Sequence, residues 1–340
     1  MRHIRKSGRG SFYSSWDEDD DMKTIDERIA QSEALWRRYR YENMGVRESC
    51  GRLFSAAKRS MQKRIRRAAT AVNYAMTRTC FSPSYDKAKE NLIVSLTSTE
   101  SRIRRIFPTL CSLAGQKRKP DIIVLWLGDK GAYPPSVISR IEDMGIMVRY
   151  REDVGPNTKY FYAFDEFKND LVITVDDDII YDRMMTEELY GGHLEHPDTV
   201  VARRVHKIRF SPSKKPVRYS DWIWEYRGGG GPAHDLLATG VGGVLYPPAV
   251  MAGMTPANRD FLKVCPMCDD IWLKFCEVEG GIKVYPVCAS RFDLDVIRPG
   301  SQKRSLAVKN IDGGRNDRAV KACANYFGLR HDLCERFLEV

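Results

Sequence analysis

The chain has 340 residues, of which 43% are hydrophobic and 29% charged, and its formal net charge is +10 at pH 7. This length is enough to bury a full hydrophobic core, and the composition is ordinary for a soluble globular protein, which excludes a miniprotein. No uncharged apolar stretch approaches the roughly 18 to 20 residues that span a bilayer, so we expect no membrane-spanning segment.

The N-terminus, MRHIRKSGRGSFYSSWDEDDD, is basic and then acidic. It lacks the apolar core of a secretory signal, so export is not expected. The nine cysteines are odd in number and scattered along the chain, which favours reduced thiols. We therefore expect a cytoplasmic protein.

Residues 1–90 hold most of the positive charge, with 20 Lys/Arg against 12 Asp/Glu. The pattern of residues 24–45 predicts a helix that opens with a Thr24–Glu27 capping box. Residues 51–80 contain eight Lys/Arg and no acidic residue, and apolar side chains recur there every three or four positions. This spacing predicts a basic amphipathic helix. We expect residues 1–90 to form a basic helical extension.

Two interpretations fit residues 51–80. The helix lies on an anionic membrane surface, where each Lys or Arg contributes on the order of 1 kcal/mol, or it packs its apolar face on the main domain. Nucleic-acid binding is not expected, because the segment has no interleaved aromatic residues and no recognisable reading motif. The first interpretation predicts a protein bound peripherally to the inner face of the membrane.

From residue 91 onward, short β-rich runs alternate with helical patterns. We expect strands over 91–98, 121–128, 146–152 and 171–178, and helices over 101–116, 134–145 and 157–167. Such alternation predicts an α/β fold with a mainly parallel sheet covered on both faces. Ligands of these sheets bind beyond the carboxyl ends of the strands.

The run VITVDDDIIY places three consecutive carboxylates, Asp176, Asp177 and Asp178, at the end of the fourth expected strand. Adjacent like charges repel by roughly 1 kcal/mol in water and by several kcal/mol at a partly dehydrated site, so the triplet calls for a cation. Mn²⁺ and Mg²⁺ prefer carboxylate oxygens. We expect a divalent metal here; the alternative is an acidic turn or a casual calcium site.

A second carboxylate pair, Asp269 and Asp270, opens a helical pattern in CPMCDDIWLKF. The N-terminal end of a helix favours anions, and the alternative is that one of the two merely caps the helix. In the same run, Cys265 and Cys268 form a lone CxxC pair. No second CxxC or His pair completes it, so zinc or redox chemistry is not expected.

Five motifs follow one another in the chain: IVSLTSTESRI, DVGPNTKYFYAF, VITVDDDIIYD, TGVGGVLYPP and CDDIWLKF. Their order and spacing resemble the nucleotide-sugar-dependent glycosyltransferases with the GT-A fold, most closely bacterial enzymes that build capsule, lipopolysaccharide or other surface glycans. The resemblance covers about residues 91–318 and implies a Rossmann-like, mainly parallel sheet flanked by helices. Residues 1–90 remain a helical extension, and residues 319–340 a C-terminal helix.

The resemblance implies transfer of a hexosyl or pentosyl group from a nucleotide-diphosphate sugar to a hydroxyl of a glycan or glycolipid acceptor. It implies inversion, a Mn²⁺ or Mg²⁺ ion and a role in surface polysaccharide synthesis. Asp178 and Asp176 are then the metal ligands, and Asp176 and Asp177 also contact the donor. Asp270 is the expected base, which contributes about 10² to 10⁴ in rate, while Asp269 binds the acceptor or orients its neighbour.

The resemblance also places the donor's base and ribose directly after the first strand, where Thr97, Ser98 and Arg102 are the candidate contacts. Asp129, after the second strand, either accepts a hydrogen bond from the base or belongs to a turn. Lys159 either reaches a phosphate or is a solvent-exposed lysine.

For the sugar and the acceptor, Gly240, Gly242 and Gly243 allow close approach to the backbone. Trp222 and Trp224 either stack on a sugar face or lie in the core, which is the commoner fate of tryptophan. Residues 226–235, YRGGGGPAHD, form either a lid or acceptor loop or a slack surface loop.

In many GT-A enzymes a histidine near the end of the domain completes the coordination of the metal ion. No equivalent histidine is identifiable in this sequence. His331 lies beyond the resembling region. The remaining coordination falls to phosphate and water or to the segment from Gln302 to Asp317, where Asn316 and Asp317 are the candidate substitutes. His206 is more consistent with a structural histidine than with a ligand.

Two other functions compete. A sugar nucleotidyltransferase shares the layered architecture and the carboxylate-held Mg²⁺, but it needs a glycine-rich, basic phosphate loop after its first strand, and SLTSTESRI has no glycine. A non-catalytic membrane-surface protein with a vestigial transferase domain predicts donor binding without turnover.

Overall fold

The computed structural model describes residues 81–213, 216–227, 230–254, 259–287, 295–296, 314–328 and 333–338. The helices expected over 24–45 and 51–80 lie outside these residues, as do His331 and the segment 302–310, so those expectations remain predictions. In the part of the chain that is described, no helix is long and apolar enough to cross a membrane.

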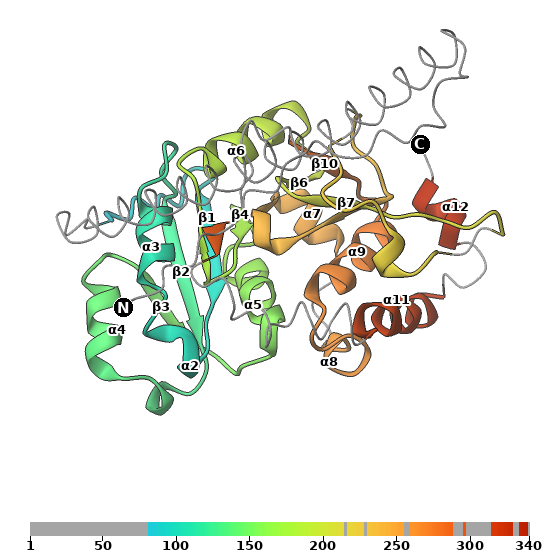
Figure 1. Cartoon of the computed structure of the whole chain (residues 1–340). Coiled ribbons are helices and arrows are strands. Elements are labelled where there is room, and N and C mark those ends of the chain that lie inside the picture. The colour runs from blue at the N-terminus through green and yellow to red at the C-terminus, as the bar shows by residue number, and fades with distance from the viewer. Residues whose placement is uncertain are drawn as a thin grey trace, which may run out of the picture. The chain divides into compact units, whose positions relative to one another are not determined.

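The centre of the fold is a seven-stranded sheet (Figure 1). Its strands are β1 (Leu92–Thr97), β2 (Ile122–Leu127), β3 (Met147–Tyr150), β4 (Leu171–Thr174), β6 (Val200–Ala202), β9 (Val244–Tyr246) and β10 (Val284–Pro286). Their order is β10-β6-β9-β4-β1-β2-β3. Strand β9 runs antiparallel to β4 and β6, and all other neighbouring pairs are parallel. Two short antiparallel ribbons pair β5 (Ile179–Ile180) with β11 (Asp295–Val296) and β7 (Val205–Lys207) with β8 (Leu236–Ala238).

The strands form where apolar and β-branched residues run continuously, as in LIVSLT of β1 and IIVLWL of β2. Strands of this kind are buried on both faces of a parallel sheet. Ile93 pairs in register with Val172 and Val94 with Ile173, and the two pairs lie in different core clusters, on opposite faces of the sheet. Strand β4 ends at Thr174, so the acidic triplet lies in the turn before β5, whereas the sequence predicted a strand over 171–178 that included the triplet.

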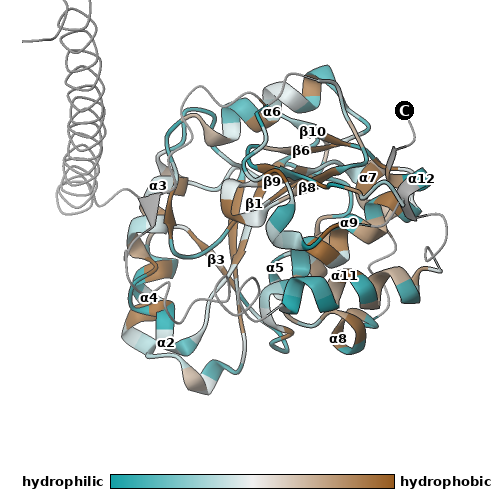
Figure 2. Ribbon diagram, turned by 45° about the vertical axis from the view of Figure 1, so that its right-hand side comes forward, coloured by the Kyte–Doolittle hydropathy of each residue, from teal (hydrophilic) through white to brown (hydrophobic). Residues whose placement is uncertain are grey.

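Helices cover both faces of the sheet (Figures 1 and 2). The cluster on one face includes residues of α3 (Phe107–Ala114), α4 (Pro135–Glu142) and α6 (Met185–Glu195), and the cluster on the other includes residues of α5 (Thr158–Glu166), α9 (Asp269–Glu279) and α11 (Arg315–Tyr326). The shorter helices are α2 (Glu100–Ile103), α7 (Pro248–Gly253), α8 (Phe261–Val264) and α12 (Leu333–Leu338). A mainly parallel α/β sheet flanked by helices, as predicted, is confirmed.

Two predicted helices differ from the structure. The helix expected over 101–116 is divided into α2 and α3, because Pro108 lies in the first turn of α3, where the missing N–H costs no helical hydrogen bond. In place of one C-terminal helix, α11 begins at Arg315 and is followed by α12. Gly328, just after α11, has φ +70°, a conformation that favours glycine and ends a helix.

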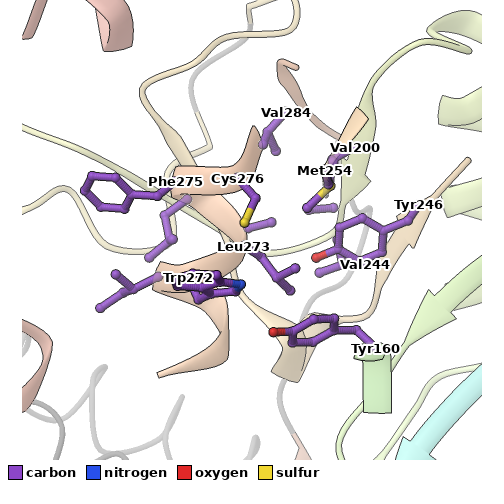
Figure 3. Close-up of a cluster of buried hydrophobic side chains, with 14 of the residues drawn as sticks. Tyr160, Val200, Val244, Tyr246, Met254, Trp272, Leu273, Phe275, Cys276 and Val284 are labelled. Atoms are coloured by element: carbon purple, nitrogen blue, oxygen red, sulfur yellow. The ribbon is translucent and has the colours of Figure 1, made fainter. Parts of the chain in front are cut away.

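Helix α9 is anchored by its apolar side chains (Figure 3). Its residues Trp272, Leu273, Phe275 and Cys276 are buried in the core cluster. The labelled partners around them are Tyr160, Val200, Val244, Tyr246, Met254 and Val284. Burial on this scale fixes the N-terminal turn of α9, and with it Asp269 and Asp270, relative to the sheet.

Candidate functional site

The candidate site is built around Lys159, at the start of α5. Its Nζ lies 2.8 Å from Asp176 Oδ1 and 3.0 Å from Asp269 Oδ2, and its side chain is 7% exposed. Lys159 is therefore not a solvent-exposed lysine. It brings the two carboxylate motifs, which are far apart in the sequence, into one site beside the carboxyl ends of β1 and β4.

The position of Lys159 is fixed through β1. Ser95 Oγ donates a 2.5 Å hydrogen bond to the Lys159 carbonyl oxygen and accepts one of 2.8 Å from Trp126 Nε1. Sequence reasoning did not single out Ser95. Its signal was a small hydroxyl residue inside the apolar run LIVSLT, where a buried polar group needs a partner.

Lys159 stays protonated in this surrounding. Burial alone would lower the pKa of its ammonium group, but the charges of Asp176, Asp269 and Asp270 together raise that pKa well above the usual value. The ammonium group therefore acts as a fixed positive charge among three carboxyl groups.

A second cationic side chain, Arg102, pairs with the other two carboxylates of the triplet. Its Nη2 contacts Asp177 Oδ1 and lies 2.8 Å from Asp178 Oδ2. Ser98 Oγ donates a 2.5 Å hydrogen bond to Asp177 Oδ2, and the Thr109 hydroxyl donates one of 2.9 Å to the Asp177 carbonyl oxygen. The structure thus brings Ser98 and Arg102 together with the triplet, and their contact with a donor remains a prediction.

The middle carboxylate differs from its neighbours. Burial raises the pKa of Asp177 to about 6, although Arg102 and Ser98 act in the opposite direction. The side chain of Asp177 is 6% exposed, whereas those of Asp176 and Asp178 are 32% and 42% exposed. Only the two outer carboxylates are therefore open to a ligand from solvent.

Asp176 and Asp178 supply the hard oxygens that Mn²⁺ and Mg²⁺ prefer, and cationic side chains already pair with both. Among the described residues, no group of three or more Asp, Glu, His or Cys is placed to hold a metal ion. A divalent ion held by these two carboxylates would need its remaining ligands from phosphate and water.

Asp270 lies on the other side of Lys159. The N–H of Gly240 donates a 3.0 Å hydrogen bond to Asp270 Oδ1. Burial, with the charge of Asp269 next, raises the pKa of Asp270 to about 8, although Lys159 lowers it. Cys268, not an aspartate, occupies the N-cap position of α9, and the helix has no side-chain cap hydrogen bond. The helix-cap alternative for Asp269 and Asp270 is thus wrong.

The glycines expected near the sugar need correction. A Cβ on Gly243, whose φ is +87°, would approach Met185 and Leu189 of α6, so this residue faces helix packing and not the site. Gly242 is buried in the 3₁₀ turn η5 (Gly240–Gly242). The glycine beside the site is Gly240, where a Cβ would come within 2.7 Å of Lys159 Nζ.

Thr97 and Asp129 have local partners. The Thr97 hydroxyl donates a 3.0 Å hydrogen bond to the Trp126 carbonyl oxygen. Asp129 is exposed and precedes the turn η2 (Lys130–Ala132). Its side chain caps this turn by accepting a 3.0 Å hydrogen bond from the N–H of Gly131. The turn interpretation of Asp129 is thus supported, and a contact with a donor base remains a prediction.

The two tryptophans differ. Trp222 is 6% exposed, lies in the core and donates a hydrogen bond of 3.1 Å to the Val217 carbonyl oxygen, so the expectation that it stacks on a sugar is wrong. Trp224 is 37% exposed and stacks on the buried His206. The interpretation of His206 as a structural histidine agrees with this packing.

The candidate substitutes for the late metal ligand are engaged in packing. Asn316 Oδ1 accepts a hydrogen bond from Cys268 Sγ, and Asp317 Oδ1 accepts one of 2.8 Å from the N–H of Tyr219. Both belong to α11. Their partners tie α11 to neighbouring segments and argue against a metal-binding role.

The CxxC pair is buried, with Cys265 2% and Cys268 5% exposed, and both are free thiols.

The described part of the glycine-rich segment 226–235 is held near its two ends by backbone hydrogen bonds. Tyr226 N donates to the Val205 carbonyl oxygen, and Ala233 and Val284 exchange two backbone hydrogen bonds.

No family model and no curated protein matches the chain. Similar solved structures include glucosyl-3-phosphoglycerate synthase from Mycobacterium tuberculosis in complex with Mn²⁺, UDP-glucose and phosphoglyceric acid, with 17% identity, a TM-score of 0.28, and coverage of 34% of this chain and 44% of that one. A mannosyltransferase from Pyrobaculum calidifontis in complex with GDP-mannose and Mn²⁺ has 10% identity, a TM-score of 0.43, and coverage of 81% and 80%. The chain thus spans less than half of the synthase.

Proposed function

We propose that this chain is an inverting, metal-dependent glycosyltransferase that moves a sugar from a nucleotide-diphosphate sugar to a hydroxyl of a glycan or glycolipid. The observation that supports it most is the double ion pair of Lys159, which joins Asp176 of the expected donor motif to Asp269 of the expected base motif. Two carboxylate motifs with separate expected roles thereby share one site.

Asp270 is the base in this proposal. Its carboxylate takes the proton from the acceptor hydroxyl, the acceptor oxygen forms a bond to the anomeric carbon, and the bond from that carbon to the nucleoside diphosphate breaks. A carboxyl group with a pKa of about 8 is a stronger base than an ordinary aspartate, which suits proton removal from a hydroxyl near neutral pH. The Gly240 N–H orients the carboxyl group through Oδ1.

Asp176 and Asp178 would hold the divalent ion, which when bound neutralises charge on the leaving diphosphate. The Ser98 hydroxyl holds the Asp177 carboxylate by a hydrogen bond, and the Arg102 guanidinium contacts the carboxylates of Asp177 and Asp178. Because a guanidinium matches phosphate oxygens, Arg102 is the candidate phosphate contact of the chain. Lys159 also pairs with two carboxylates, but its side chain is only 7% exposed, against 41% for Arg102.

We further propose that the acceptor belongs to a bacterial surface polysaccharide and that residues 51–80 hold the enzyme on the inner face of the membrane. Both proposals rest on the sequence, through the resemblance of the five motifs and the charge of that segment. The nucleotidyltransferase alternative has no specific support, because the connection after β1 carries no glycine for a phosphate loop.

The test is release of nucleoside diphosphate from a panel of UDP-, GDP-, CDP- and ADP-sugars, with Mn²⁺, with Mg²⁺ and with EDTA. We expect release from at least one donor, its loss with EDTA, and its loss in Asp178→Ala. Glu142→Gln, which alters an exposed carboxylate at the end of α4, serves as the control and should match wild type. Turnover that survives Asp178→Ala and EDTA would refute the proposal.

A further inference from the structure

A cluster of charged and aromatic side chains lies beside Asp270 and is not used by the proposed donor site. The N–H of Gly240 binds Asp270, and Gly240 follows Thr239 in the chain. Arg204 Nη1 donates a 3.2 Å hydrogen bond to the Thr239 hydroxyl, and Arg204 Nε donates one of 3.3 Å to Glu225 Oε1. The Arg204–Glu225 pair is thus linked to the proposed base through the consecutive residues Thr239 and Gly240, one of which binds Arg204 and the other Asp270.

Trp224 forms the aromatic wall of this cluster. Its ring stacks on His206, with centroids 4.8 Å apart and 29° between the planes, and meets the edge of Tyr219 at 5.7 Å. Burial raises the pKa of Tyr219, and the charge of Asp270 is close enough to raise it further. Trp224 is therefore fixed by packing near the base, and it still exposes part of its ring to solvent.

Trp224 packs on an uncharged ring, the imidazole of His206. His206 Nδ1 accepts a 3.0 Å hydrogen bond from the N–H of Glu225. Burial, with the charge of Arg204 next, lowers the pKa of His206 to about 3. At physiological pH the imidazole is therefore neutral.

Glu225 is the one non-glycine residue with positive φ, +50°, in the part of the chain that the structure describes. Such backbone conformations are strained by the order of 1 kcal/mol or more and persist where the surroundings hold them, often at functional sites. Here the backbone N–H is bound to His206 and the carboxylate to Arg204. The Glu225 side chain is left 47% exposed beside Trp224.

We propose that Trp224, Glu225 and Arg204 form the subsite for the sugar ring of the acceptor, an inference that rests on the proposed function. An aromatic ring packs against the apolar C–H face of a sugar, while a carboxylate accepts and a guanidinium donates hydrogen bonds to its hydroxyls. Because Arg204 and Glu225 neutralise each other, the subsite matches an uncharged sugar and not one that carries a carboxylate or phosphate. The ligand class is a neutral glycan.

The test applies the full chain, with Mn²⁺ and whichever of UDP, GDP, CDP and ADP it binds, to an array that carries neutral and acidic glycans. Calorimetry measures nucleotide affinity separately. Affinity for neutral glycans should fall about tenfold or more in both Trp224→Ala and Glu225→Gln, equivalent to about 1.4 kcal/mol or more. Ile223→Ala is the matched control, because Ile223 is a neighbouring exposed apolar residue whose contacts to Lys207 are made by the backbone.

Three results would overturn the subsite and leave the proposed function standing: unchanged glycan binding in both variants, a preference of the wild type for acidic glycans, or no glycan binding by a chain that binds nucleotide. A wild-type chain that binds none of the nucleotide diphosphates would instead refute the proposed function.

Discussion

The ammonium group of Lys159 lies 3.0 Å from the carboxylate of Asp269, although one residue lies in the first turn of α5 and the other opens α9. A buried charge of this kind is costly unless it is paired. The same ammonium group also pairs with Asp176. This one side chain therefore forms ion pairs with both carboxylate motifs.

Lys159→Met should destabilise the fold and abolish turnover. It leaves Asp176 and Asp269 without their buried counter-ion, and loss of one partner of a buried pair typically costs about 3 to 5 kcal/mol. Urea unfolding measures the effect. Lys117→Met is the control, since its pair with Glu187 is exposed and screened by solvent, so its loss should leave stability nearly unchanged. Equal effects of the two substitutions would contradict the assigned role.

Activity should rise with pH through about 8. Asp270 works as a base only when it is deprotonated, and its pKa is raised to about 8, so below that pH each unit of acidification should lower kcat/KM about tenfold. A pH series of kcat/KM from 5.5 to 9 tests this. Asp270→Asn should remove the activity at every pH. A profile that is flat between pH 6 and 8 would exclude Asp270 as the base.

Arg102→Ala should change two affinities in opposite directions. Removing the guanidinium frees Asp178 and leaves the triplet more negative, so Mn²⁺ should bind more tightly without nucleotide, by several-fold or about 1 kcal/mol. Nucleoside diphosphate should bind more weakly, because a phosphate contact is lost. Electron paramagnetic resonance measures free Mn²⁺, and calorimetry measures nucleotide binding.

The control for that experiment is Arg104→Ala, which removes an exposed arginine from the same short segment. It should leave both affinities unchanged. If Arg102→Ala weakens Mn²⁺ binding, or leaves it as it is, Arg102 does not compete with the ion for the triplet.

Gly240→Ala should impair catalysis more than stability. The new Cβ would lie 2.7 Å from Lys159 Nζ and 3.4 Å from Asp270 Oδ1, so the ammonium group must move away from its carboxylates. We expect kcat to fall about tenfold or more, the equivalent of about 1.4 kcal/mol in the barrier. Gly191→Ala in α6, where a Cβ meets nothing within 4 Å, should be neutral or stabilising by about 1 kcal/mol. Wild-type kcat in Gly240→Ala would show that the site tolerates this displacement.

Membrane association is tested in residues 51–80. Replacing Arg64, Arg66 and Arg67 by Glu lowers the net charge of that segment from +8 to +2 and should abolish sedimentation with vesicles that contain phosphatidylserine. Vesicles of phosphatidylcholine alone are the control and should bind neither protein. Retained binding by the substituted protein would exclude this segment as the membrane contact.

Much of the fold was determined by local sequence. Continuous apolar runs with β-branched residues identified β1, β2, β3 and β4, and helical periodicity between them identified α4 and α5, because both signals depend only on neighbours along the chain. The same locality placed the acidic triplet directly after β4 and Asp269 with Asp270 in the first turn of α9.

Only the tertiary structure decided which side chains meet. Lys159 was expected at a phosphate, and it instead pairs with carboxylates of two distant segments. Trp222 and Trp224 are the same residue type two positions apart, yet one is buried and the other exposed. Ion pairs and burial depend on which segments pack together across the sheet, and neither residue type nor spacing along the chain encodes that packing.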